Sequence, residues 1–264
     1  MKRIIALILA MALCLSLASC KSKKKNKDDN NAASAEPYEI SVNVSYRCED
    51  ATVSKIFEQI GGAMINIAVD GDKLKLESSL DIDYGDGVNS FTETYVIADG
   101  EVYMLVSYDS DDKASTVKNK AEITDEDKAT IYKRISVVGG VSTSDFKNYS
   151  VENLGSKEIR TYTNLTEEGK IKLEKIMLRQ LEGAPELVTS GAAEMKVTTV
   201  DGKYDSVTIA CTYEITIAGG VYTVEMTAEM DYDYRGATSV KVPEDADEYY
   251  YVTKDKILGI EIEN

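Results

Sequence analysis

Residues 72–84 read DKLKLESSLDIDY, and their apolar and polar side chains alternate one by one. A period of two is typical of a β-strand that buries one face and leaves the other in water. The interior face of this strand would carry Leu74, Leu76, Leu80 and Ile82. The polar second face indicates antiparallel pairing, because strands of a buried parallel sheet are apolar on both faces.

The same alternation recurs along most of the chain. Residues 38–48, YEISVNVSYRC, place Ile40, Val42, Val44, Tyr46 and Cys48 on one face. Further strands are predicted over residues 88–98, 101–108, 149–154, 157–163, 193–200, 204–217 and 221–235. Several alternations are separated by dipeptides typical of hairpin turns, namely Asp70-Gly71, Asp99-Gly100, Asp201-Gly202 and Gly219-Gly220. A long antiparallel sheet is therefore expected.

Two segments show the helical period clearly. In the first, Val53, Ile56, Phe57 and Ile60 recur at i, i+3, i+4 and i+7, and Gly61 supplies a stop. The second can be capped by Thr166. It carries a stripe of Leu173, Ile176, Met177 and Leu181 and ends at Gly183 and Pro185.

A third helix is predicted after Thr124, which forms a capping box with Asp127 in place of the usual glutamate. Each of the three helices has one apolar side, and that side must pack on the sheet. The sequence therefore predicts an α+β domain. No Pro- or Ser-rich linker divides the chain from Pro37 onward, so residues 37–264 are expected to form one domain.

The first twenty residues have the parts of an export signal. Lys2 and Arg3 precede an apolar run, and Leu17-Ala18-Ser19 leads to Cys20. This run looks like a bacterial lipobox, in which the signal is cut before a cysteine that then receives a lipid. Residues 1–19 are thus predicted to be a signal peptide and Cys20 the site of lipid attachment; ordinary cleavage and an uncleaved anchor are the alternatives.

Residues 20–36 are expected to be a flexible tether, since they lack apolar periodicity. Five lysines give residues 21–30 a net charge of +3, which favours an anionic membrane surface. A diacylglyceryl group on Cys20 would hold the protein at the extracytoplasmic face of the bacterial membrane.

The domain itself is strongly acidic. The whole chain carries a net charge of −16, and −21 remains on residues 31–264 once the +2 of residues 1–19 and the +3 of residues 21–30 are set aside. Such a surface repels phosphates, so no nucleic-acid partner is expected. Acidity most simply provides solubility.

The sequence has no histidine, which excludes Ser-His-Asp and Cys-His nucleophile pairs and removes the commonest zinc ligand. The acidic stretches Asp81–Gly87 and Asp109–Asp112 do not have the spacing of a calcium loop and are interpreted as polar turns. Neither a catalytic residue, a metal site nor a cofactor is predicted, and the protein is not expected to be an enzyme.

Two cysteines remain in the domain, Cys48 and Cys211, and both lie on apolar strand faces. They could form a disulfide in an exported protein if their strands are neighbours. Cysteine is also a common small core residue, and two buried thiols are the favoured interpretation.

The order of these elements resembles the LolA-like lipoproteins, in particular the LppX/LprG group. The similarity covers residues 37–250 and includes ADGEVYM (Ala98–Met104) and VKVPEDA (Val240–Ala246). It implies a long curved sheet forming an unclosed half-barrel, with about three helices on the concave face. In some members the space between sheet and helices binds acyl chains. The acidic surface and the tail after residue 248 depart from that family.

The resemblance, together with the periodicity, assigns a ligand cavity to Ile56, Phe57, Ile60, Ile209, Tyr213 and Ile215. Alternation alone does not separate a cavity from a filled core. We therefore expect a lipoprotein that binds or carries a lipid or another hydrophobic ligand. The alternative is a surface lipoprotein with a filled core that acts through protein contacts, for which Tyr232, Tyr234 and Tyr249–Tyr251 would be suited.

Overall fold

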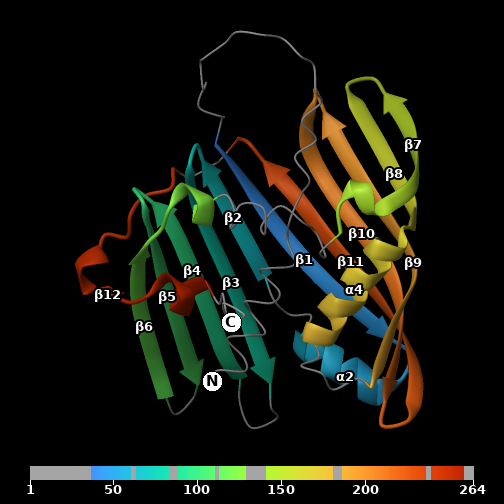
Figure 1. Ribbon diagram of the computed structural model, residues 1–264, viewed down its shortest axis with the longest axis horizontal. Coiled ribbons are helices and arrows are strands. Elements are labelled where there is room, and N and C mark those ends of the chain that lie inside the picture. Colours follow the sequence, from blue (N-terminus) through green and yellow to red (C-terminus); the bar gives the residue numbers. More distant parts are fainter. Residues whose placement is uncertain are drawn as a thin grey trace.

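A computed structural model describes residues 37–60, 64–83, 88–110, 113–128, 141–180, 186–235 and 239–258. The described residues contain twelve strands that belong to one sheet (Figure 1). The first six are β1 (Tyr38–Cys48), β2 (Met64–Asp70), β3 (Lys73–Asp83), β4 (Val88–Ala98), β5 (Glu101–Ser110) and β6 (Lys113–Glu122). The others are β7 (Phe146–Leu154), β8 (Lys157–Leu165), β9 (Leu187–Val200), β10 (Lys203–Ile217), β11 (Gly220–Asp233) and β12 (Tyr250–Tyr251).

The strands lie in the order β12-β6-β5-β4-β3-β2-β1-β11-β10-β9-β8-β7. Strand β1 is central and pairs with β2 on one side and with β11 on the other. The chain therefore makes one meander from β1 out to β6, and a second from the opposite edge, β7, back to β11. All pairs are antiparallel except the short pair of β12 with β6. The ends do not meet, so the sheet is a curved, unclosed one, as predicted.

Tight turns join the strands at or next to the predicted dipeptides. The first lies one residue later than expected, at Gly71-Asp72, because Asp70 pairs with Lys73. Asp99 and Gly100 both have positive φ angles, 54° and 86°, as do Asp201 and Gly202, with 50° and 78°. Two successive positive φ values are the geometry of the hairpin turn whose twist matches that of the strands. The last turn lies one residue earlier than expected, at Ala218-Gly219, and Gly220 already belongs to β11.

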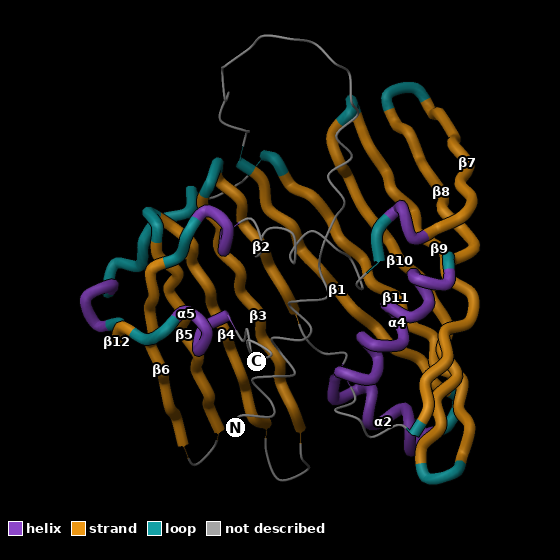
Figure 2. Tube along the Cα trace, in the orientation of Figure 1, coloured by secondary structure: helices purple, strands orange, loops and turns teal. Residues whose placement is uncertain are grey.

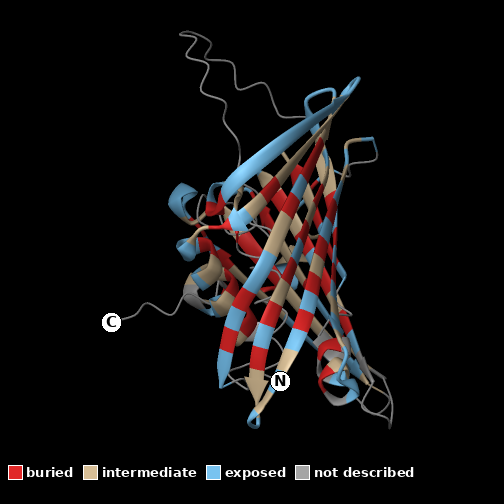
Figure 3. Cartoon of the chain, turned by 90° about the vertical axis from the view of Figure 1, so that its right-hand side faces the viewer, coloured by how far each residue is buried: buried red, intermediate tan, exposed pale blue. Residues whose placement is uncertain are grey.

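Alternation along the strands sorts side chains onto two faces (Figure 3). The inner face forms one large apolar cluster to which every strand from β1 to β11 contributes. In β1, for example, Ile40, Val42 and Val44 are buried while Ser41 and Asn43 are exposed. A smaller cluster lies on the outer face, built on Val96 of β4 and Tyr103 of β5.

The helices cover the inner face (Figure 2). Helix α2 (Ala51–Ile60) packs on β1 and β3, α4 (Glu167–Gln180) packs on β8 and β9, and α5 (Lys254–Leu258) packs on β6. The predicted helix after Thr124 begins as expected, since Asp127 accepts a hydrogen bond from the Thr124 N–H at 2.9 Å. Its continuation lies outside the described residues. Single-turn 3₁₀ helices are formed by Thr143–Asp145 and Ala246–Glu248.

The C-terminal part of the chain wraps around one edge of the sheet. Residues 239–251, here called the strap, lie on the outer face, where Val240 and Tyr249 pack against Val96 and Tyr103. The strap then pairs with β6 through β12, and α5 places Ile257 in the inner cluster. The same segment thus contacts both faces at the β6 edge.

Several strands differ from the sequence-based boundaries. Strand β6 was not predicted, because KASTVKNKAE carries Val117 as its single large apolar side chain. Strand β9 begins at Leu187 rather than at residue 193, and its pairing with β10 is irregular between Cys211 and Tyr213. The predicted signal peptide, the tether and Cys20 lie outside the described residues.

Candidate functional site on the concave face

Helix α4 is fixed on the inner face by apolar and polar contacts. The hydroxyl of Thr166 accepts a hydrogen bond from the Gly169 N–H at 3.1 Å, which is the predicted cap. Leu173 and Met177 of the predicted stripe are completely buried, while Ile176 is half-buried. On the adjacent turn Glu174 accepts hydrogen bonds from the N–H and the hydroxyl of Ser190 in β9.

The start of α4 also requires a glycine. A Cβ atom at Gly169 would lie 2.8 Å from the carbonyl oxygen of Asp145, so any larger residue would push the helix away. Asp145 is itself buried and forms an ion pair with Lys172 at 2.8 Å. These contacts place α4 close to the sheet at the β8–β9 end.

Helix α2 closes the neighbouring part of the inner face. The Asp50 carboxylate accepts a hydrogen bond from the Val53 N–H at 3.0 Å and thereby caps the helix. Phe57 is 2% exposed, and its ring lies 5.0 Å from that of Tyr46 in β1. The side chains of Ile56 and Ile60, also assigned to the cavity, lie outside the described part of the structure.

The remaining cavity residues predicted from the sequence all lie on β10. Ile209, Tyr213 and Ile215 are no more than 1% exposed and belong to the same apolar cluster as Phe57. The fold therefore brings together the four predicted residues whose side chains are described. In this state they are in close contact with their neighbours, so this end of the concave face is closed.

The concave face is less covered toward β6. The inward side chains Val106 and Tyr108 of β5 are half-buried, and Val117 of β6 is 48% exposed. The ring of Tyr108 lies 4.8 Å from that of Phe91 in β4, tilted by 42°, and its hydroxyl donates a hydrogen bond to Asn89 Oδ1 at 2.6 Å. An apolar and aromatic surface thus continues from the closed core to a more open rim.

Polar residues interrupt this surface at one place. The pairing registers define a row of nine inward positions across the sheet, one on each strand from β9 to β6 by way of β1. The row runs Val197, Val207, Met230, Val42, Ile65, Ser78, Glu93, Val106, Val117. Only Ser78 and Glu93 are polar, and they are direct cross-strand partners on β3 and β4.

Glu93 is an unusual residue for this position. It is 1% exposed, and its Oε1 accepts a hydrogen bond from the hydroxyl of Tyr95. Among the described residues, neither its Oε2 nor the buried Oγ of Ser78 has a hydrogen-bond partner. Burial raises the pKa of the Glu93 carboxyl to about 7, and the Tyr95 hydrogen bond opposes that rise. Periodicity alone did not single out Glu93, although it lies on the same strand face as the apolar residues Phe91, Tyr95 and Ile97.

Described residues also line two grooves away from this surface. The first, of about 770 Å³, runs between the strap and the outer face of β1 to β5, and both Lys75 and Glu77 line it. The second, of about 830 Å³, is lined by residues of β7 to β11 and by Lys170 of α4. Both grooves are lined by lysine and glutamate side chains. The inward side chains around Glu93, by contrast, are mainly apolar.

The described cysteines are both free. Cys48 of β1 pairs with Val224 and Cys211 of β10 pairs with Met226, so strand β11 lies between them. Their Cα atoms are therefore roughly two strand spacings, about 10 Å, apart, beyond the reach of a disulfide. Burial raises the pKa of Cys211 to about 12, while Cys48 is only half-buried, contrary to the prediction of two buried thiols.

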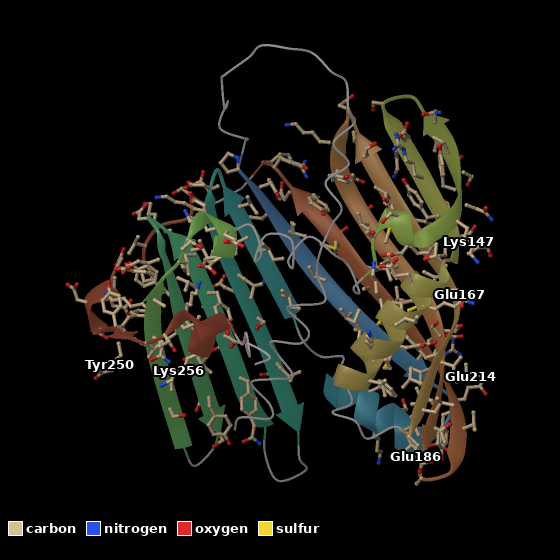
Figure 4. All side chains as sticks on the ribbon, viewed as in Figure 1. Lys147, Glu167, Glu186, Glu214, Tyr250 and Lys256 are labelled. Carbon is tan, nitrogen blue, oxygen red and sulfur yellow. The ribbon has the colours of Figure 1, made fainter. Side chains whose placement is uncertain are left out.

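The tyrosines considered for protein contacts fall into two groups. Tyr250 and Tyr251 are 76% and 64% exposed at the β6 edge, and Figure 4 shows Tyr250 pointing away from the sheet. Tyr249 is buried against Tyr103. Tyr232 and Tyr234 are half-buried, and the rings of both lie in tilted contact with that of Tyr38 in β1.

The described residues contain no group of three or more acidic, cysteine or histidine side chains placed to hold a metal ion. Within the same residues, no helix has the length and apolar composition needed to cross a membrane. In comparisons with known proteins, no family model matches the chain, and no curated protein matches it either.

Proposed function

We propose that this protein is a membrane-anchored, extracytoplasmic lipoprotein that binds a lipid or another hydrophobic ligand on the concave face of its sheet. The observation that supports the proposal is the apolar surface that runs from the buried residues of β10 to the partly exposed Val106, Tyr108 and Val117. Apolar surface that stays partly exposed beside a core can mark a ligand-binding groove.

Such a surface can supply useful affinity without special polar chemistry. Each methylene that leaves water contributes about 0.8 kcal/mol, so ten would contribute roughly 8 kcal/mol before the cost of ordering the chain. That magnitude corresponds to binding in the micromolar range. A ligand would enter at the β5–β6 rim, and the lining predicted at Phe57, Ile209, Tyr213 and Ile215 would be reached if α2 and α4 moved outward.

The cellular location rests on the sequence. The lipobox-like Leu17–Cys20 and the lysine-rich tether are typical of a lipoprotein held at the outer face of a bacterial membrane. The resemblance to LolA-like lipoproteins supports the same role, since some of them bind acyl chains. We propose a binding protein rather than an enzyme.

A second function, contact with another protein, is favoured by one observation. Tyr250 and Tyr251 project from the β6 edge with most of their surface exposed, and tyrosine is enriched at protein interfaces. In this case the concave face would be a filled core, and no ligand would be needed.

The two functions are separated by testing for a bound ligand. Native mass spectrometry of the purified protein should show a lipid that co-purifies, and the protein should increase the fluorescence of N-phenyl-1-naphthylamine. Val117→Asp, at the inner rim, should lower the affinity for this probe at least tenfold, because it places a charge on the apolar surface.

Val221→Asp is the matched control. Val221 is an exposed valine on the outer face of β11, so its replacement should leave probe binding unchanged. Absence of any lipid or probe binding by the wild-type protein would refute ligand binding and leave the contact function.

A further inference from the structure

The most unusual feature of the concave face is its buried acid. Glu93 lies between Phe91 and Tyr95 on its own strand, with Ser78 directly opposite on β3 and Val106 directly opposite on β5. Both Oε2 of Glu93 and Oγ of Ser78 lack a hydrogen-bond partner among the described residues, although both residues are at least 97% buried. A buried acceptor without a partner destabilises the fold, so its presence points to a role.

The surroundings of Glu93 contain no described positive charge. The flanking inward positions are Leu76 and Leu80 on β3 and Met104 and Tyr108 on β5, so the titratable groups that face it are Tyr95 and Tyr108. Helix α2, which packs on β3, buries apolar Val53 and Phe57 and leaves Lys55 exposed. Helix α5, on β6, buries Ile257, while its Lys254 contacts Asp127 and its Lys256 is exposed.

We propose that Glu93 and Ser78 form the polar part of the binding site and recognise the amino group of an amphiphilic ligand whose apolar chain lies on the concave face. This inference rests on the proposed function and specifies the chemical class of its ligand. An ammonium group carries several N–H donors and a positive charge, so it can donate to Oε2 and to the serine hydroxyl together. It also neutralises a carboxylate that nothing described around it neutralises.

The same geometry disfavours other head groups. A carboxylate or phosphate would be repelled by ionised Glu93 in an environment of low dielectric constant. A simple alcohol offers one donor and no charge, so it can satisfy only one of the two oxygens. For ligands of the same chain length, the site should therefore bind an amine more tightly than an alcohol, and an alcohol more tightly than an acid.

The test uses three twelve-carbon probes with the purified protein: dodecylamine and dodecanoate below their critical micelle concentrations, and dodecanol below its solubility limit. Isothermal titration calorimetry in 0.3 M NaCl, which screens the acidic surface, would measure each affinity at pH 6 and pH 8. Because the pKa of Glu93 is about 7, its carboxyl is roughly one tenth ionised at pH 6 and nine tenths ionised at pH 8. Dodecylamine, protonated at both values, should bind about tenfold more tightly at pH 8, and dodecanol should show no such change.

Glu93→Gln removes the charge and keeps the shape. It should lower the affinity for dodecylamine at least tenfold at pH 8 and abolish the pH dependence of that affinity. The affinity for dodecanol should stay within twofold of the wild-type value. Glu77→Gln is the matched control, because it removes one acid from the outer face of neighbouring β3, where Glu77 is exposed. That variant should bind dodecylamine as the wild-type protein does.

The outcomes separate this inference from the proposed function. If none of the probes binds, both fail. If all three bind with similar affinity at both pH values, the hydrophobic function stands and amine recognition by Glu93 is refuted. Should Glu93→Gln not fold, the comparison of dodecylamine with dodecanol at the two pH values in the wild-type protein decides by itself.

Discussion

Replacing Leu173 measures how firmly α4 is attached to the concave face. Its side chain is fully buried against the sheet. Truncation of a buried leucine to alanine costs roughly 2–5 kcal/mol, because apolar contacts are lost and a cavity remains. Leu173→Ala should therefore lower the free energy of unfolding by about 3 kcal/mol, a large part of the roughly 5–15 kcal/mol typical of a domain. Leu173→Asp should cost several kcal/mol more, because it buries an unpaired carboxylate.

The same helix supplies the control. Ile171 lies two residues earlier and is 49% exposed, so Ile171→Asp introduces the same residue on the solvent side. It should change the free energy of unfolding by less than about 1 kcal/mol. Urea unfolding followed by circular dichroism gives all three values. Equal destabilisation by Ile171→Asp and Leu173→Asp would refute the packing of α4 described above.

Three further predictions concern the ends of the chain and its cysteines. Cys20→Ala should stop metabolic labelling of the protein with a fatty acid, and undiminished labelling would contradict the lipid anchor. The pKa of Asp127 is lowered from 3.8 to about 2, first by the hydrogen bond from Lys254 and then by those from Thr124. Ionised Asp127 thus stabilises the fold above pH 4, and this contribution is lost as the pH falls toward 2. The difference in unfolding free energy between the wild-type protein and Asp127→Asn, measured in urea, should accordingly shrink between pH 6 and pH 2.5; a constant difference would argue against the pair. For the cysteines, Cys48→Ser should remove the reaction of the native domain with Ellman's reagent and Cys211→Ser should not, since burial keeps Cys211 as an unreactive thiol.

Periodicity was sufficient to predict the antiparallel sheet and helices α2 and α4, but not the short helix α5. The alternation in residues 38–48 and 72–84 follows directly from one buried face, so β1 and β3 were predicted with the correct inward residues. The capping residues Thr124 and Thr166 could also be predicted from the local sequence, because each hydroxyl accepts a hydrogen bond from the backbone N–H three residues later. Local chemistry of this kind needs no knowledge of distant contacts.

Other features depend on contacts between distant parts of the chain. Strand β6 is held by its pairing with β5 and by the strap, which places Asp245 2.6 Å from Lys118, so its own sequence carries little signal. The position of the strap on the outer face could not be derived from residues 239–251 alone. Glu93 was recognisable in principle as an acid at an inward position of a regular strand, but only the register shows that Ser78 is its partner.

The central position of β1 has a consequence for the order in which the protein can fold. Val44 pairs with Ala228, which lies 184 positions further along the chain. During synthesis, β1 can pair with β2 at once, but its other edge stays open until nearly the whole second meander has been made. Such non-local pairing slows folding, and an open apolar strand edge is a template for aggregation. The acidic composition of the chain, which keeps copies apart by charge repulsion, would protect it during that interval.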